Sequence, residues 1–172
     1  KDLAGYGRIT YNIFPKGNVF QKISIGGTAT RYAYSNDPFD MNFNKLAPEL
    51  NIEFKKRRAR SPFTHTLRYR NISIIQDSYK GNYDFTPTIY SRDTLHFNFN
   101  DLTYKFAMSD AINPFSIALN FQEGQHMMKT SLTANYSYKF RKKNKGIDVR
   151  LFAGTFLGTK SADAGPYRFR MS

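Results

Sequence analysis

Residues that could carry acid–base or metal chemistry are few and scattered in this chain. The three histidines, His65, His96 and His126, lie in separate segments, with no HExxH pair and no carboxylate at ligand spacing. The stretches GRIT and GGTAT lack the strand-to-helix context of a phosphate-binding loop, and no GxSxG nucleophile motif is present. We therefore expect no catalytic residue, no metal ligand and no cofactor within this segment.

Basic side chains, in contrast, are concentrated in two short stretches of a chain whose net charge is +13. These stretches hold Lys55, Lys56, Arg57, Arg58 and Arg60, and Arg141, Lys142, Lys143 and Lys145. Near a charged membrane surface each cation contributes about 1 kcal/mol of attraction to anionic lipid headgroups. A solvated turn without a specific ligand explains the same residues equally well. Nucleic-acid binding is not expected, because neither a recognition helix nor an RNA-binding signature accompanies the charge.

The amino-acid composition limits the number of domains and the kinds of site and membrane segment that the chain can have. The 172 residues allow one domain with a sizeable core, and we treat residues 1–172 as a single segment. The absence of cysteine excludes disulfides and thiolate metal sites. No stretch approaches the ~20 apolar residues of a membrane helix. A mean hydropathy of −0.58 normally indicates a soluble protein, but the strands of a transmembrane barrel are polar on one face and give similarly low values.

The elements that must position these residues are β-strands. Apolar residues recur at every second position, which is the period of a strand with one apolar face. The clearest run is Leu132, Ala134, Tyr136, Tyr138 and Phe140. Similar runs occupy residues 9–13, 19–29 (with Gln21 as an exception), 46–54, 63–74, 95–108, 115–121 and 147–153, and a ninth begins at Tyr167. The fourth and fifth runs exchange parity, at Asn71 and near Asn100, which predicts a β-bulge in each strand.

The connections between these runs alternate in length. Those at 15–18, 55–62, 110–114 and 141–146 are short and rich in turn residues, whereas 35–45, 76–94 and 158–166 are longer; 123–127 is a short member of the second set. Short turns at one end and longer loops at the other are typical of outer-membrane β-barrels. The sequence therefore predicts an all-β, antiparallel transmembrane β-barrel, a meander of eight or nine strands that forms part of a larger barrel.

Aromatic residues border the short turns and predict a membrane-interface girdle, because aromatic rings tolerate the mixed polarity of that region. The girdle residues are Phe14, Phe54, Phe63, Phe106, Phe115 and Phe140. Among the apolar parities, Leu50, Ile52, Ile117, Leu119, Leu132 and Tyr136 are expected to face lipid.

The polar parities are expected to face the interior of the barrel. They carry more cations than acids: Arg8, Lys22, Arg68, Arg70, Lys105, Lys129 and Arg150 against Glu49, Glu53, Asp101 and Asp148. Such charges either pair across strands or bias a pore toward anions, and we favour pairing.

The stretches NPFSIALNFQEGQHMMKTSLTANYSYKF, KGIDVRLFAGTFLG and YRFRMS, between Asn113 and Ser172, resemble the C-terminal barrel of Gram-negative membrane-associated metallopeptidases related to the gluzincin aminopeptidases. They are more loosely similar to the BamA-like surface-antigen superfamily, whose Arg-Gly-Phe-type loop signature this chain lacks. The resemblance implies a location in the bacterial outer membrane. It carries over no catalytic residue, because the zinc-binding HExxH motif of the peptidases is absent from this chain.

The function expected from these observations is that of a non-catalytic membrane anchor or scaffold, incomplete at both ends and part of a larger protein or assembly. The expected partners are membrane lipids, including anionic headgroups, and the remaining barrel strands or partner subunits. A pore or protein-insertase barrel is the main alternative. A soluble β-barrel or β-sandwich binding protein would show the same alternation of apolar and polar residues. It is a more remote alternative, because the aromatic girdle, the asymmetry between turns and loops and the strand length of ~10 residues favour a membrane barrel.

Overall fold

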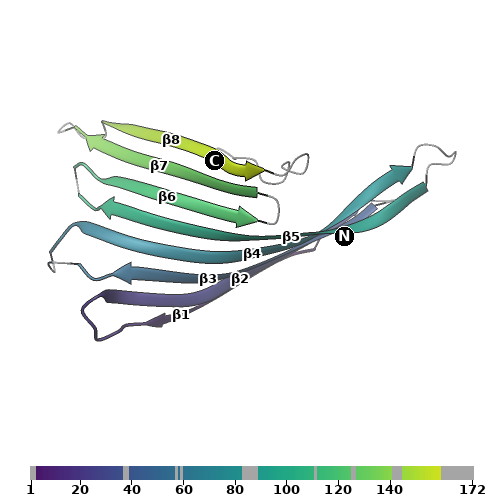
Figure 1. Cartoon of the computed structure of the whole chain (residues 1–172), viewed down its shortest axis with the longest axis horizontal. Helices are drawn as coiled ribbons and strands as arrows, with labels where there is room; N and C mark the ends of the chain where they lie inside the picture. Colours follow the sequence, from purple (N-terminus) through teal and green to yellow (C-terminus); the bar gives the residue numbers. More distant parts are fainter. Residues whose placement is uncertain are drawn as a thin grey trace.

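The computed structural model describes residues 3–36, 39–56, 58, 60–82, 89–110, 112–124, 127–140 and 145–159. Eight strands form one antiparallel sheet in which each strand pairs with its neighbour in the chain (Figure 1). The strands are β1 (Leu3–Ile13), β2 (Phe20–Asn36), β3 (Phe39–Phe54), β4 (Phe63–Asn82), β5 (Ile89–Met108), β6 (Phe115–Gly124), β7 (Met127–Lys139) and β8 (Gly146–Thr159). The predicted all-β meander is thus confirmed, while the ninth run at Tyr167 lies outside the described residues.

The sheet is not closed. Across the described residues, β1 and β8 form its two edges and do not pair with each other. Within the same ranges no helix has the length and apolar character needed to cross a membrane.

Four strands are longer than the alternation predicts. The segments 35–45 and 76–94 were expected as loops, but backbone pairing continues through most of them, from Ala33↔Asn42 to Asn36↔Phe39 and from Asp77↔Thr94 to Asn82↔Ile89. The loop prediction was wrong because these stretches lose the regular alternation while their backbones keep pairing. Figure 1 shows β2–β5 projecting beyond β6–β8 at one end of the sheet. We call residues 31–36, 39–45, 72–82 and 89–99 the extension, and the opposite end, where the short connections lie, the turn end.

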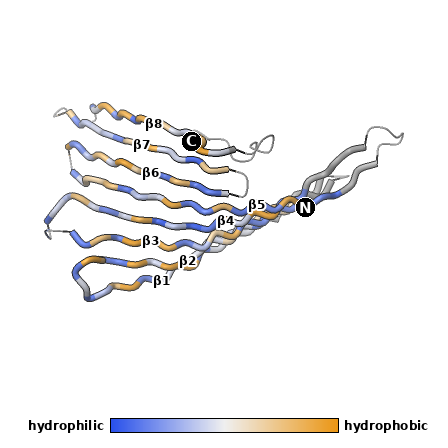
Figure 2. The backbone as a smooth tube through the Cα atoms, in the orientation of Figure 1, coloured by the Kyte–Doolittle hydropathy of each residue, from blue (hydrophilic) through white to orange (hydrophobic). Residues whose placement is uncertain are grey.

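Between the turn end and Asn71 and Asn100, the register places the predicted stripes on one face, because residues paired across an antiparallel ladder share a face. Ile52 pairs with Leu67, Leu67 with Tyr104, Tyr104 with Leu119 and Leu119 with Leu132. We call this side the band face, and the opposite side, which carries Arg68, Thr103, Asn120 and Ser131, the network face. The alternation is visible along the strands in Figure 2. The expected division of the apolar and polar parities between two faces of the sheet is confirmed.

The predicted bulges in the fourth and fifth strands are wrong. The pairing of β4 with β5 runs from Phe63↔Met108 to Asn82↔Ile89 without a register shift. The strands stay regular, and the apolar residues themselves change face beyond Asn71 and Asn100. Register shifts occur instead between Phe20 and Lys22 and between Met128 and Lys129. The first of these explains why Gln21 interrupts the alternation.

Candidate membrane-facing site

The band face carries four apolar or aromatic residues on each of five successive strands, and we call the four sets that run across these strands the apolar rows. Counted from the turn end, the residues are Phe63, His65, Leu67 and Tyr69; Met108, Phe106, Tyr104 and Leu102; Phe115, Ile117, Leu119 and Phe121; Tyr138, Tyr136, Ala134 and Leu132; and Ile147, Val149, Leu151 and Ala153. Many of these side chains are exposed, and Leu151 reaches 66%. On the edge strand β1, Ile9 is 80% exposed. Monomeric soluble proteins rarely expose a large contiguous apolar surface, and one that spans several strands indicates contact with a partner or a membrane.

The described residues contain almost no conventional core. Ala47, Ile72 and Met127 are the buried apolar residues among them, and Asp101 is the most deeply buried large side chain at 1% exposure. A single sheet has no second layer to cover its apolar face. Polarity and exposure are therefore inverted over this part of the sheet, where the apolar face is the more accessible one.

Polar residues follow the last of these apolar residues on each of the five strands, and we call them the polar belt. They are Asn71, Asn98, Asn100, Glu123, Thr130 and Thr155, all on the band face. Asn71, Asn100 and Glu123 share one row of the ladder, whereas Thr130 pairs with Phe121, one row nearer the turn end. The Asn71 Nδ2 donates to the Oδ1 atoms of Asn98 and Asn100 at 3.0 and 2.9 Å, and the Tyr69 hydroxyl donates to the Asn100 Oδ1 at 2.8 Å. Sequence analysis missed this belt, although the parity exchange at Asn71 marks its position.

Beyond the belt the two faces exchange character. The network face of the extension carries Phe43, Ile72, Ile74, Leu95, Phe97 and Phe99, with Lys45, Gln76 and Asp93 as exceptions. The band face carries Arg31, Asn42, Asn44, Asp77, Arg92, Thr94 and His96, with Ile75 as an exception. Ile72 is only 4% exposed. The extension therefore has the sidedness of an ordinary water-exposed sheet, with polar residues on the face that is apolar below the belt.

Outside the apolar rows, Asp77 of β4 anchors a polar cluster in the extension. The Arg92 guanidinium donates to the Asp77 Oδ2 at 2.6 Å, and the Asn42 backbone and side-chain N–H groups donate to the same oxygen at 2.9 and 3.0 Å. The hydrogen bond from Arg92, helped by those from Asn42, holds the pKa of the Asp77 carboxyl below its usual value despite burial.

Below the belt, the network face contains a hydrogen-bonded hub around Asp101. Its carboxylate accepts from the Gln122 Nε2 at 2.6 Å, the Asn120 Nδ2 at 2.9 Å and the Thr103 hydroxyl at 3.2 Å, and it forms an ion pair with Arg70 at 3.4 Å. These residues come from β4, β5 and β6, so the hub fastens three strands. Arg8 of β1 pairs with Glu49 of β3 at 2.9 Å. The interpretation that charges on the polar parity pair across strands is thus supported for two of its cations.

Five of the six predicted girdle residues lie at the turn end in three aromatic clusters. Phe63, Phe106 and Phe115 form one cluster: the rings of Phe63 and Phe106 stack at 5.6 Å, and the ring of Phe115 meets both edge-on at 6.5 and 5.6 Å. Separately, Phe54 contacts Phe20 at 5.8 Å, and Phe140 contacts Tyr138 at 5.3 Å. Phe14 is 69% exposed beside the first turn.

The predicted cations are brought together in one of the two turns. A hollow of about 820 Å³ opens where the β3–β4 connection meets the band face. Its lining comprises Lys55, Lys56, Arg58, Arg60, Ser61, Pro62, Phe63, His65 and Phe106. Lys145 is exposed in the β7–β8 connection. Arg57, Arg141, Lys142 and Lys143 lie outside the described residues.

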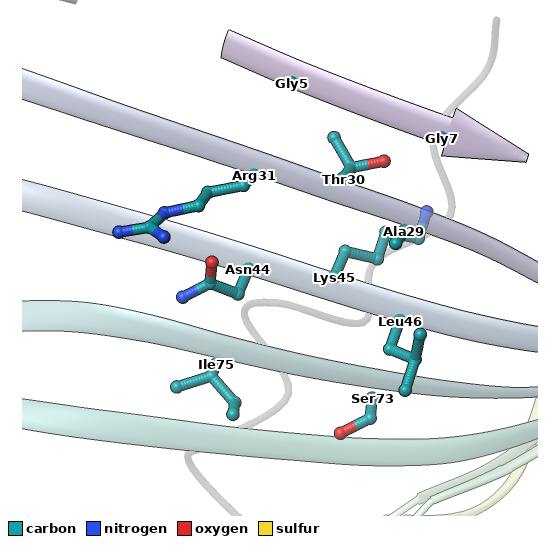
Figure 3. Close-up of a pocket in the computed structure, with 10 residues that line it drawn as sticks. All are labelled: Gly5, Gly7, Ala29, Thr30, Arg31, Asn44, Lys45, Leu46, Ser73 and Ile75. Carbon is teal, nitrogen blue, oxygen red and sulfur yellow. The ribbon is translucent and has the colours of Figure 1, made fainter. Parts of the chain in front are cut away.

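A second, shallower hollow of about 460 Å³ crosses β1–β4 near the belt (Figure 3). Gly5, Gly7 and Ala29 leave it open because they have little or no side chain. Arg31 and Asn44 lie at one end, and Leu46 lies at the other.

No group of three or more potential metal ligands occurs among the described residues. His65 lies on the band face, where its Nδ1 and the Tyr104 hydroxyl are hydrogen-bonded at 2.7 Å. His126 lies outside the described part of the chain.

No protein-family model matches this chain, and searches among curated proteins and solved structures gave no match either. The resemblance to peptidase-associated and surface-antigen barrels remains a prediction from sequence.

Proposed function

We propose that this segment is a membrane-embedded wall of a bacterial outer-membrane β-barrel, serving as a non-catalytic anchor or scaffold of a larger protein or assembly. In this proposal the band face meets lipid between the girdle and the polar belt, and the extension stands outside the membrane. The catalytic or transport machinery of the assembly, where there is any, lies elsewhere.

The exchange of face character at the polar belt is the observation that carries the proposal. On β4 and β5 the apolar residues occupy the band face up to Tyr69 and Leu102, and the network face from Ile72 and Phe99 onward, with no change of register. A sheet that lies entirely in water keeps its apolar residues on the same face along its whole length, because the same face is turned away from water throughout. A sheet that leaves a bilayer has reason to change faces at the point of exit, because its outer surface then meets water.

The height of the band agrees with a membrane barrel. Phe63 and Asn71 bound the apolar rows of β4 and lie eight residues apart, or about 27 Å along a strand that rises ~3.4 Å per residue. A strand tilt of about 40° reduces this to roughly 20 Å, near the ~25 Å apolar band of transmembrane barrels.

The two open edges of the sheet indicate which structures must lie beside the segment in a membrane. Among the described residues, no further strand pairs with the outer edge of β1 or β8. Unpaired backbone groups are not tolerated in hydrocarbon, where each costs several kcal/mol. The proposal therefore requires additional strands, from the same polypeptide or from a partner subunit, to pair with both edges. This requirement favours part of a larger barrel over an independent pore.

The proposal is tested by placing a charge on each face at one level. Ile117 lies on the second band-face row of β6, and Ser116 is its neighbour on the network face. A charge near the bilayer midplane on the lipid side costs about 2–4 kcal/mol. In the complete barrel that contains this segment, we expect Ile117→Arg to reduce insertion into phosphatidylcholine liposomes strongly, measured as the protease-protected fraction, and Ser116→Arg to have little effect.

Ile117 is 41% exposed, so a water-exposed sheet would accept arginine there at least as readily as at Ser116. Equal insertion of the two variants would contradict the membrane proposal.

A further inference from the structure

The hollow at the turn end joins two unlike walls. One wall is cationic and consists of Lys55, Lys56, Arg58 and Arg60. Lys55, Arg58 and Arg60 are exposed, and no carboxylate lines the hollow within the described ranges. The density of positive charge in so small a space favours an anionic ligand.

The other wall is aromatic and continues the band face. The stacked rings of Phe63 and Phe106 lie beside His65, whose ring centre is 4.8 Å from that of Phe106. Phe63 is 38% exposed. Because this wall passes directly into the apolar rows above it, a ligand with an apolar tail would lie along the band face.

The connection that carries the cations is held by its own hydrogen bonds. The Ser61 N–H donates to the Arg58 carbonyl at 2.9 Å, and the Phe63 N–H donates to the Ser61 hydroxyl at 3.4 Å. On the other side, the Lys55 N–H donates to the Val19 carbonyl at 2.9 Å. These contacts fix where the cationic connection begins and ends relative to the aromatic wall.

We propose that this hollow binds one anionic glycerophospholipid, with the phosphate among the cations and an acyl chain against Phe63 and Phe106. Guanidinium groups bind phosphate oxygens through two parallel hydrogen bonds, which suits Arg58 and Arg60. The inference rests on the proposed function, in which short turns face the periplasm and so meet the phospholipid leaflet.

The test uses the protein in phosphatidylcholine nanodiscs that contain a trace of spin-labelled phosphatidylglycerol or spin-labelled phosphatidylcholine. Electron paramagnetic resonance reports how much of each label the protein immobilises. We expect a preference for phosphatidylglycerol that Arg58→Gln/Arg60→Gln largely removes. Because each cation contributes about fivefold in affinity, removing two should lower the preference by about 25-fold.

The matched control is Lys105→Gln/Lys139→Gln, which removes the same charge from exposed residues of the network face, away from the hollow. It should keep the preference. An equal loss in both double variants would show diffuse attraction and overturn the site.

Competition and the wild-type spectrum distinguish the remaining outcomes. Displacement of the lipid by millimolar inorganic phosphate would show a phosphate site without a role for the acyl chain, which also overturns the proposal. Binding of polyglutamate without any lipid preference would assign the hollow to an acidic protein. Equal immobilisation of both labels would reject the lipid site alone, whereas immobilisation of neither would reject the membrane wall itself.

Discussion

At the scale of single residues, Gly26 sets how closely β1 approaches β2. A Cβ added to this residue would lie 2.3 Å from the Ile9 carbonyl oxygen and 3.0 Å from the Thr10 Cα. At the adjacent Gly27 the nearest atom, the Pro48 Cα, would be 3.4 Å away. Two consecutive glycines therefore have different roles: the first allows a close backbone approach, and the second leaves room for a methyl group.

This difference predicts the behaviour of two alanine variants. Gly26→Ala should destabilise the sheet by about 1–3 kcal/mol, because β1 must shift away from β2. Gly27→Ala should be neutral, or stabilising by up to about 1 kcal/mol through a less flexible unfolded chain. Urea unfolding in detergent, followed by tyrosine fluorescence, measures both. Matching midpoints for the two variants would mean that the close approach at Gly26 has no energetic weight.

The residues that could be predicted from the sequence are those whose role follows from local pattern. Phe63, Phe106 and Phe115 stood beside turns in the sequence, and the structure places their rings in contact. Asp101 and the polar belt could not be recognised in the same way. The partners of Asp101 come from three strands, and Asn71, Asn98 and Asn100 meet only through the register of β4 with β5.

At the scale of elements, the extension depends on polar contacts on its band face. Asp77 is 5% exposed and pairs across strands with Arg92 of β5 and Asn42 of β3. Because these contacts lower the pKa of the folded carboxyl, they stabilise the extension above the unfolded pKa of about 3.9. The stabilisation is lost as the pH falls through the lower, folded value.

The prediction is that Asp77→Asn loosens the extension at neutral pH. The loss is expected to be about 1 kcal/mol, since the Arg92 side chain is half-exposed and solvent screens the pair. Amide exchange of residues 72–77 should accelerate about fivefold at pH 7, and the variant should show less additional acceleration below about pH 4 than the wild type.

Asp110→Asn, which removes a carboxyl at the turn end, serves as the control and should leave the exchange of residues 72–77 unchanged. If the wild type and Asp77→Asn respond identically to acid, the Asp77 carboxyl does not support the extension.

The existence of the strands followed from their period, but their ends did not. Alternation identifies a strand only where one face is apolar. Residues 76–94 contain no regular alternation of apolar and polar residues, so the sequence resembles a loop, although the backbones of β4 and β5 pair as far as Asn82 and Ile89. The change of face at Asn71 was interpreted as a bulge for a related reason. A parity exchange in one strand cannot distinguish an inserted residue from a change in what surrounds the sheet.

At the scale of the whole molecule, the polar belt should mark one level of the membrane surface. The chain has no cysteine, so single cysteines can report this level without background. Leu67 and Ile75 both lie on the band face of β4, below and above the belt. In liposomes, a water-soluble maleimide present on both sides should label Ile75→Cys rapidly and Leu67→Cys slowly, because reagent and thiolate are excluded from hydrocarbon.

Unfolding in urea should equalise the labelling of the two positions, which shows that the intrinsic reactivity of the thiols is the same. Rapid labelling of Leu67→Cys in liposomes would place the apolar rows in water and contradict the proposed membrane location.

The four apolar rows have a mechanical consequence for the lipid around them. A hydrophobic height of roughly 20 Å is shorter than the ~30 Å hydrocarbon core of a typical bilayer. The acyl chains next to β4–β8 would have to tilt or shorten, and the bilayer would thin around the protein at a cost of a fraction of a kcal/mol per Å of mismatch. Such a wall would settle in the thinnest membrane available and would draw short-chain lipids to its surface. The distance between the phenylalanine girdle and the polar belt would thus determine the membrane thickness that the protein prefers.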